Sequence, residues 1–196
     1  MTVVTTFYTM DNKDGVDLNF AQTSISVTTD PSTPAPRAKL GDTVLGNNGS
    51  QWIFCQASAT VTCYNVVAID TNFQIRTATT AIAASQIYTF GILEMQPNQF
   101  GATVSIGNAN GGVLNVSDFM WVAQKISGGG QVNMITTAAA GGKLFISGSS
   151  PGSLTSTASS WYFPGINPIA ALATTTVVTP SEFVQSSYLV AVLTTS

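Results

Sequence analysis

Short segments rich in β-branched and aromatic residues recur along the chain from Leu40 onward. In several of them, such as Gln51–Ala57, neighbouring side chains fall on opposite faces of an extended strand. Asn-Gly and Gly-Gly steps separate the segments and supply the positive φ that tight hairpins require. The pattern predicts ten strands: Thr43–Leu45, Gln51–Ala57, Val61–Ile69, Ile87–Glu94, Ala102–Ile106, Asp118–Ile126, Val132–Thr137, Leu144–Ser147, Thr175–Val178 and Tyr188–Thr194.

Helix signals are scarce in this sequence. Thr179-Pro180-Ser181-Glu182 has a capping residue, Pro at the first helical position and Glu three residues after the cap. It predicts one or two helical turns through Phe183 and Val184, and a further short turn is expected at Asn167–Ala173. Many short strands at regular spacing predict a mainly β protein, an antiparallel sandwich or barrel. The pattern leaves sandwich and barrel both open.

The first 39 residues differ from the rest. A strand-like segment, Val3–Met10, is followed by a passage in which Pro31, Pro34 and Pro36 enforce an extended backbone. We therefore expect residues 1–39 to form an extended N-terminal strand or arm with a Pro-rich linker, and residues 40–196 to form a β-rich domain. The segment is either a linker after an edge hairpin or an arm that reaches another subunit, and both interpretations remain open.

The composition predicts a surface with unusually few charges. Only 8% of the residues are charged, against about 25% in typical soluble domains. Hydrophobic residues make up an ordinary 44%, so Ser, Thr, Asn, Gln and Gly supply most of the polarity. A neutral, hydroxyl-rich surface repels itself weakly and packs against neighbours with little desolvation of charge. This is typical of structural and assembly proteins.

The charge distribution also bears on partners. Six Lys and Arg against nine Asp and Glu give a net charge of −3, and the basic residues are scattered along the chain. Neutralising many phosphates requires a basic patch, so we expect no nucleic-acid partner. The chain has no apolar run near the ~20 residues that span a bilayer and no secretory signal pattern at its start. We expect no membrane partner and synthesis in a cytosol.

The two cysteines, Cys55 and Cys63, lie in consecutive predicted strands. With a turn near Ala59 they would come roughly opposite each other. A disulfide between directly paired strands is geometrically awkward, and a cytosolic chain keeps its thiols reduced. A zinc site would need further ligands, but the chain has no His and no other Cys. We expect two small, half-buried, reduced hydrophobic residues.

An acidic segment near the N-terminus is the other candidate metal site. Asp11, Asp14 and Asp17 resemble a calcium loop, but Lys13 takes the third position and no Glu follows at the twelfth. We interpret the segment as a solvated turn, with a loose cation site left open. No cofactor is expected.

Catalytic motifs are absent from the sequence. Gly141-Gly142-Lys143-Leu144 lacks the Ser or Thr and the first Gly of a phosphate loop. Serine nucleophiles have no His to activate them, and no G-x-S-x-G occurs. Nine dispersed acids give no reason to choose a pair for glycoside hydrolysis. We therefore expect that the protein is not an enzyme.

Aromatic residues supply the candidate contacts. Trp52 and Trp121 lie inside strand patterns and are expected in the core. The run Trp161–Phe163 ends in a turn at Pro164-Gly165, so partial exposure is expected there. The candidate contacts to a partner protein or another subunit are Phe7, Tyr8, Pro34, Arg37, Trp161, Tyr162 and Phe163.

Four stretches of the chain resemble one family. LGDTVLGNNGSQWIFCQAS (Leu40–Ser58) is similar to the opening G-x-x-V-x-G-x-x-G-S-x-[aromatic]-x-x-x-Q-A segment of tailed-phage head decoration, or cement, proteins. The stretches at Tyr64–Asp70, Asp118–Gly128 and Ala138–Ser156 resemble its continuation. Where related proteins have an aromatic-Gly-Trp-Val step, this chain has FMWV at residues 119–122. The likeness covers residues 40–156.

The resemblance implies a non-enzymatic β-domain that binds the outside of an icosahedral shell, often as a small oligomer. Its partners would be the major capsid protein and further copies of itself. Its location would be the capsid exterior of the virion, after synthesis in the host cytoplasm. Two alternatives stay open: a carbohydrate-binding module of a virion fibre or knob that reads sugars with Trp161, and a shell-forming jelly-roll coat protein. The lack of a basic arm counts against the second.

Overall fold

The computed structural model describes residues 38–46, 49–94, 113–126, 132–164 and 166–168, and the backbone of 183–185 and 192–193. The described part is mainly β, as expected, with one helix in it, α2 (Thr80–Ser85). Its strands are β1 (Thr43–Leu45), β2 (Gln51–Ala57), β3 (Val61–Thr62), β4 (Val66–Ile69), β5 (Gln74–Thr77), β6 (Thr89–Ile92), β7 (Val113–Leu114), β8 (Phe119–Lys125), β9 (Phe145–Ile146), β10 (Leu154–Thr155), β11 (Trp161–Tyr162), β12 (Ile166–Pro168), β13 (Phe183–Gln185) and β14 (Val192–Leu193).

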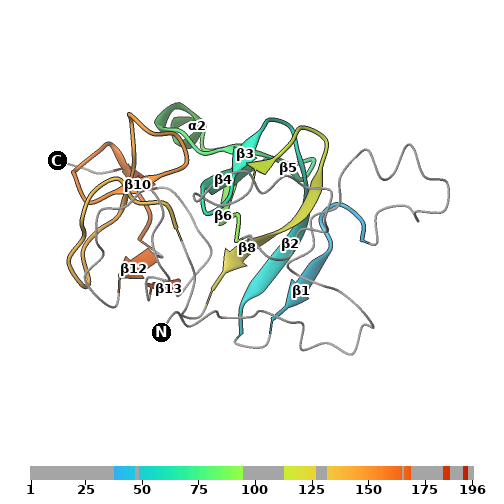
Figure 1. The fold of residues 1–196 in the computed structure, drawn as a ribbon, viewed down its shortest axis with the longest axis horizontal. Helices are drawn as coiled ribbons and strands as arrows, with labels where there is room; N and C mark the ends of the chain where they lie inside the picture. The colour runs from blue at the N-terminus through green and yellow to red at the C-terminus, as the bar shows by residue number, and fades with distance from the viewer. Residues whose placement is uncertain are drawn as a thin grey trace.

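Five strands close into a barrel in the order β2-β5-β4-β6-β8, and β8 pairs back onto β2 (Figure 1). The neighbours are antiparallel except β2 and β5, which run parallel. One side of β2 pairs with β8 along most of its length, and its other side is shared by β1 at the start and β5 at the end. The barrel decides between the two architectures that the sequence left open.

Alternation along the strands produces two hydrophobic clusters. Residues of one parity fill the barrel, and every barrel strand or its direct continuation contributes to this interior cluster: Ile53, Cys55, Ala57, Val67, Ile69, Ile75, Leu93, Met120 and Val122. Gly91 of β6 faces the same interior, where a Cβ would lie 2.5 Å from Val122 Cγ1 and 2.8 Å from the Ala123 carbonyl oxygen. A side chain at position 91 would therefore push β6 away from β8.

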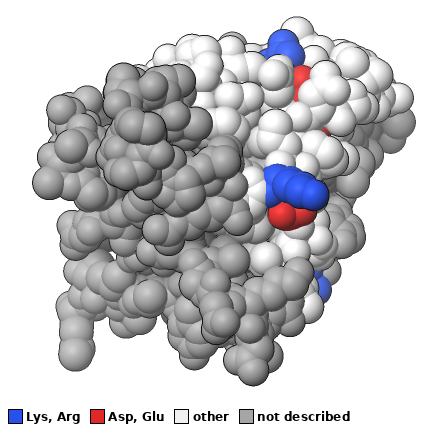
Figure 2. Space-filling view, turned by 90° about the vertical axis from the view of Figure 1, so that its right-hand side faces the viewer, with Lys and Arg blue, Asp and Glu red and all other residues white. Residues whose placement is uncertain are grey.

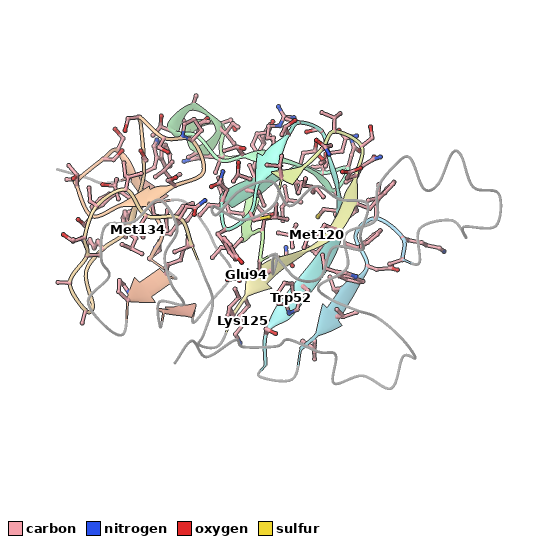
Figure 3. The ribbon with its side chains drawn as sticks, in the orientation of Figure 1. Trp52, Glu94, Met120, Lys125 and Met134 are labelled. Carbon is pink, nitrogen blue, oxygen red and sulfur yellow. The ribbon has the colours of Figure 1, made fainter. Side chains whose placement is uncertain are left out.

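Residues of the opposite parity form an outer cluster that joins the barrel to the C-terminal part, which we define as the described residues of 132–168 together with β13 and β14 (Figure 3). The C-terminal part contains the sheet β10-β9-β11-β14 and the pair β12–β13. Phe90 of the barrel meets Phe163 edge to face, with ring centroids 5.3 Å apart. Trp52 and Met134 are fully buried in the same cluster. One continuous core therefore holds the barrel and the C-terminal part together.

A ring of three backbone hydrogen bonds connects the two parts. Ala78 N–H donates to Val66 O (3.0 Å), Gly152 N–H donates to Ala78 O (2.8 Å), and Val66 N–H donates to Gly152 O (2.8 Å). Gly152 adopts φ +77°, and a Cβ there would lie 2.6 Å from the Asn65 side chain. Asn133 reinforces the ring because its Nδ2 donates to Asn65 Oδ1 (2.6 Å). We call Asn65, Val66, Ala78, Asn133 and Gly152 the junction.

Several predicted strands match the structure. β1 and β2 have the expected bounds, and the segments at 87–94, 118–126 and 144–147 contain β6, β8 and β9. The single strand expected at Val61–Ile69 is two strands, because Tyr64 adopts φ 62° between β3 and β4. The strand expected at Val132–Thr137 is wrong: Met134 makes an isolated bridge to Leu154 instead.

The predicted C-terminal helix is also wrong. Phe183–Gln185 forms β13, which pairs with β12, and β12 replaces the first residues of the short turn expected at Asn167–Ala173. The helix in the described residues, α2, was not predicted. Its cap is Thr79, whose Oγ1 accepts from Ile82 N–H (3.2 Å). The expected N-terminal arm and the strands at Ala102–Ile106 and Thr175–Val178 lie outside the described residues.

The junction generates a matched pair of stability predictions. We expect Gly152→Ala to lower the free energy of unfolding by about 3 kcal/mol, because positive φ and contact with Asn65 both oppose a Cβ. Gly141→Ala is the control, since Gly141 has φ +71° with no atom within 4 Å of an added Cβ. It should cost about 1 kcal/mol from backbone strain. Urea unfolding measures both, and equal losses would contradict the packing role of Gly152.

Candidate interaction surface

The two cysteines are buried core residues. Cys55 lies opposite Met120 of β8, whereas β3, just before Cys63, pairs with β7, so the two do not face each other across a hairpin as expected. Both are free thiols with no exposed surface, more buried than the sequence suggested. Burial, and secondarily the charge of Asp70, raise the pKa of the Cys55 thiol far above its ordinary value. Since the thiolate is the reactive form, Cys55 is inert in the folded protein.

A second buried titratable group lies beside the junction. Tyr64 is 4% exposed, and its backbone N–H donates to Leu93 O (2.7 Å) while its carbonyl accepts from Asn133 N–H (2.9 Å). Burial raises the pKa of the Tyr64 hydroxyl, with smaller contributions from Glu94 and Cys63. Tyr64 thus stays neutral across the physiological range and serves the packing between β3 and β4.

The described residues contain no group of three or more His, Cys, Asp or Glu side chains placed to hold a metal ion. The candidate cation segment at Asp11, Asp14 and Asp17 lies outside the described residues. Within the described part of the chain, no helix has the length and apolar character to cross a membrane.

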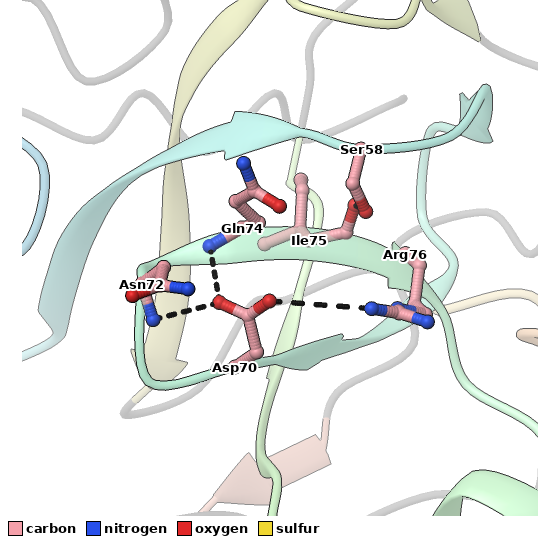
Figure 4. A network of polar contacts seen from close by, with 6 residues as sticks. All are labelled: Ser58, Asp70, Asn72, Gln74, Ile75 and Arg76. Atoms are coloured by element: carbon pink, nitrogen blue, oxygen red, sulfur yellow. Dashed lines mark hydrogen bonds and ion pairs between the residues drawn. The ribbon is translucent and has the colours of Figure 1, made fainter.

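One polar network on the barrel organises a hairpin (Figure 4). Asp70 Oδ1 accepts from the backbone N–H groups of Asn72 (2.8 Å) and Gln74 (2.9 Å), which fixes the turn between β4 and β5. Asp70 Oδ2 lies 4.0 Å from Arg76 Nη2, and the Arg76 guanidinium lies over the Tyr88 ring at 5.4 Å. The carboxylate is therefore engaged within its own hairpin, which indicates a structural role.

The aromatic run at residues 161–163 is mostly core. Trp161 is 7% exposed and Phe163 is 1% exposed, so the expected partial exposure is wrong for both. They face the outer cluster, against the barrel, while Tyr162 points the other way and is partly exposed. Lys143 Nζ lies 5.2 Å from the centroid of the Tyr162 ring. The other candidate contacts, at positions 7, 8, 34 and 37, lie outside the described residues.

The exposed residues of the C-terminal part are almost all small and uncharged. Between Lys125 and Glu182 the sequence has a single charged residue, Lys143. The other exposed residues in the described range 135–160 are uncharged, and all except Ile135 are small. We call this set the small-residue surface: Thr137, Ala139, Ala140, Gly141, Gly148, Ser149, Pro151, Ser156, Thr157, Ala158 and Ser160.

Internal hydrogen bonds engage two hydroxyl groups of this surface, those of Ser149 and Ser156. Thr136 Oγ1 lies 3.0 Å from Thr155 Oγ1 and accepts from Ser156 N–H (2.7 Å). Ser156 Oγ donates in turn to Thr137 O (2.6 Å). A hydroxyl already bonded within the protein loses fewer water contacts when a partner covers it. Covering these hydroxyl groups with a partner therefore costs less desolvation free energy than covering free hydroxyl groups.

Charges on the barrel are sparse as well. The face in Figure 2 is largely uncoloured in its described part, with separate blue groups and red groups beside some of them. Asp70 and Arg76, 4.0 Å apart, are one pair of opposite charges on the barrel. No basic patch that would suit nucleic acid is present on the described part of this face.

Comparisons of the chain with protein-family models, with curated proteins and with solved structures found no match.

Thiol chemistry provides a direct test of the barrel interior. At pH 8 iodoacetamide should modify neither Cys55 nor Cys63 in the folded protein, because both are fully buried. In concentrated guanidinium chloride without reductant it should modify both, because both are free thiols. Intact-mass spectrometry counts the modifications. Rapid labelling of the folded chain, or two modifications only after reduction, would contradict the structure.

The raised pKa values also predict how stability depends on pH. Folding favours the neutral forms of Cys55 and Tyr64, so their contribution is complete below the unfolded pKa values of about 9 and 10 and is lost as pH rises above them. Each group lowers the free energy of unfolding by up to about 1.4 kcal/mol per pH unit there. Urea unfolding between pH 7 and pH 11 measures the loss. Cys55→Ala should remove the part that begins near pH 9, and an unchanged profile would contradict this assignment.

Proposed function

We propose that this protein is a non-enzymatic structural protein that binds other protein subunits in a large assembly, namely the outside of a tailed-phage capsid. The observation that carries the proposal is the small-residue surface, where a long stretch of the fold exposes almost no charge. Its partner would be the major capsid protein, and its place the capsid exterior of the virion.

Physical chemistry favours this surface for burial against a protein. Ordering Gly, Ala and Pro side chains costs almost no conformational entropy, whereas Lys, Arg, Glu and Gln lose up to about 2 kcal/mol each. A surface with Lys143 as its one charge also avoids most of the desolvation penalty that buried ions incur. Small side chains further allow two backbones to approach closely. These properties suit repeated, tightly packed contacts in a shell.

The choice of a capsid rests on the resemblance of residues 40–156 to decoration proteins. The structure gives the glycines of the first matching stretch a folding role. Gly41 has φ +87°, and a Cβ there would lie 2.5 Å from the Phe73 ring. At Gly46 a Cβ would overlap Ser50 Oγ, which accepts from Trp52 Nε1 (2.8 Å). The motif thus specifies the β1–β2 hairpin, in keeping with a family that shares a fold and has no catalytic residues.

Mass action would then stabilise the shell. A protein that binds assembled capsomers and not dissociated subunits stabilises the assembly by RT ln(1 + [L]/Kd) per site. The carbohydrate-binding alternative is weaker, because Trp161, the aromatic residue chosen to read sugars, is buried. The coat-protein alternative is weaker too, because a jelly roll packs eight strands in two sheets, unlike the closed five-strand barrel seen here.

Electron microscopy of virions tests the proposal. Antibodies against this chain should label the outer surface of intact virions, and virions made without the chain should lack that density and lose their genome at lower temperature or at lower chelator concentration. Labelling of fibres or of no virion structure would contradict capsid decoration.

Charge insertion tests the surface itself. The double variant Ala139→Glu with Ala158→Glu places two carboxylates on the small-residue surface and should weaken binding to virions lacking the chain at least about tenfold, because buried unpaired charges are costly. Ala81→Glu is the matched control on exposed α2, at a position in the first helical turn that tolerates an acid. Co-sedimentation measures both. Equal binding by the double variant and the wild type would remove this surface from the interface.

A further inference from the structure

Lys143 is a single positive charge beside the small-residue surface. Its side chain is exposed and follows the small residues 139–142 along the chain. The acids nearest to it in the sequence are Asp118 and Glu182. Among the described residues, no carboxylate forms an ion pair with its ammonium group. The charge of Lys143 is therefore not neutralised within the described part of the fold.

An aromatic pair positions the Lys143 side chain. Tyr162 of β11 pairs with Phe145 of β9, and their ring centroids lie 6.0 Å apart. Lys143 precedes Phe145 by two residues, so its side chain is on the same face of the sheet, with Nζ 5.2 Å from the Tyr162 ring centroid. The negative face of an aromatic ring attracts a cation. Contact with Tyr162 therefore restricts where the ammonium group lies.

The C-terminal sheet connects Lys143 to the rest of the small-residue surface. Thr155 of β10 pairs with Phe145 on the side opposite Tyr162, so the row from Tyr162 to Thr155 spans two strand spacings, about 10 Å. Lys143 lies beside one end of this row, and Ser156 follows Thr155 at the other. A standard protein interface covers about 800 Å² on each partner, which is wider than this separation. A partner that covers Ser156 and residues 139–142 therefore also reaches Lys143.

Covering Lys143 requires an opposite charge. An ammonium group that loses its water without gaining a partner is strongly destabilising. The cation–π contact with Tyr162 offsets only part of that cost. A carboxylate of the partner would accept hydrogen bonds from Lys143 Nζ and neutralise its charge. A phosphate-rich partner suits the site less well, because one ammonium group neutralises only one of many phosphates.

We infer that Lys143 binds a carboxylate, an Asp or Glu side chain, of the capsid protein that covers the small-residue surface. The inference rests on the proposed function and adds the chemistry of the partner: an uncharged surface over residues 139–142 with one acid opposite Lys143. A single charge pair in neutral surroundings also sets the register of the contact, because a shifted partner leaves the ammonium group unpaired.

Zero-length cross-linking of virions carrying the full chain identifies the group opposite Lys143. A carbodiimide activates a carboxylate, a neighbouring amine then forms an amide with it, and the carbodiimide leaves as its urea. Mass spectrometry should find Lys143 joined to an Asp or Glu of the capsid protein. Lys143→Arg keeps the positive charge but lacks the amine, so it should bind within about threefold of the wild type and lose the cross-link.

Co-sedimentation with virions lacking the chain measures the effect of the charge. Lys143→Met keeps a long side chain without charge and should raise Kd at least about tenfold, because the carboxylate of the partner stays unpaired. Lys143→Glu should raise Kd about a hundredfold, because it brings two carboxylates together. Lys39→Met and Lys39→Glu are the matched controls at an exposed position before β1, and both should bind within about threefold of the wild type. Thermal melts check that every variant is folded.

The outcomes separate this inference from the proposed function. Equal binding by Lys143→Met and the wild type would overturn the inference, as would a cross-link that also forms in the free chain or leads to another copy of it. If the double variant Ala139→Glu with Ala158→Glu still weakens binding in that case, the surface remains the interface and only the carboxylate is wrong. A wild type that does not bind virions would overturn the proposed function, and the inference with it.

Discussion

The ring of three backbone hydrogen bonds among Val66, Ala78 and Gly152 attaches the C-terminal part to the barrel. It inserts the turn before β10 between the start of β4 and the end of β5, and so fixes where the C-terminal part meets the barrel. An L-residue with a side chain fits this place poorly, because φ is positive and Asn65 occupies the space. The outer cluster can close over the barrel because this contact sets the distance between them.

The parts predicted correctly from sequence are those determined by local signals. The sequence between β1 and β2 contains an Asn-Gly step, and both strands are rich in β-branched or aromatic residues, so their bounds could be predicted from the chain. β5 was missed because Ile75 is its only apolar residue, and it is a strand because β2 and β4 pair with it on both sides. The Thr79 cap was a usable signal for α2, although the helix is only six residues long.

The errors have a common physical origin in contacts between distant segments. Phe183 and Val184 follow a good helix cap, but pairing with β12 outweighs that local preference. Trp161 precedes a turn, yet it is buried because the barrel offers its outer face to the C-terminal sheet. The low charge of the chain predicted that the protein would have a neutral, hydroxyl-rich surface. The position of this surface on the fold could not be predicted, because it depends on which small residues stay exposed after the C-terminal part packs against the barrel.

The closure of the barrel has a consequence for how the chain reaches its native state. β2 and β8 pair residues more than 60 positions apart, and the parallel β2–β5 pair further requires β4 to lie beyond β5. Non-local pairing of this kind is slow, in the range of milliseconds to seconds, since loop-closure entropy is lost before contacts form. During synthesis, the backbone groups of β2 that pair with β8 have no β8 to bond until that strand leaves the ribosome. The β4–β5 hairpin is the most local pair of the barrel, and in the folded protein Asp70 accepts two backbone hydrogen bonds in its turn.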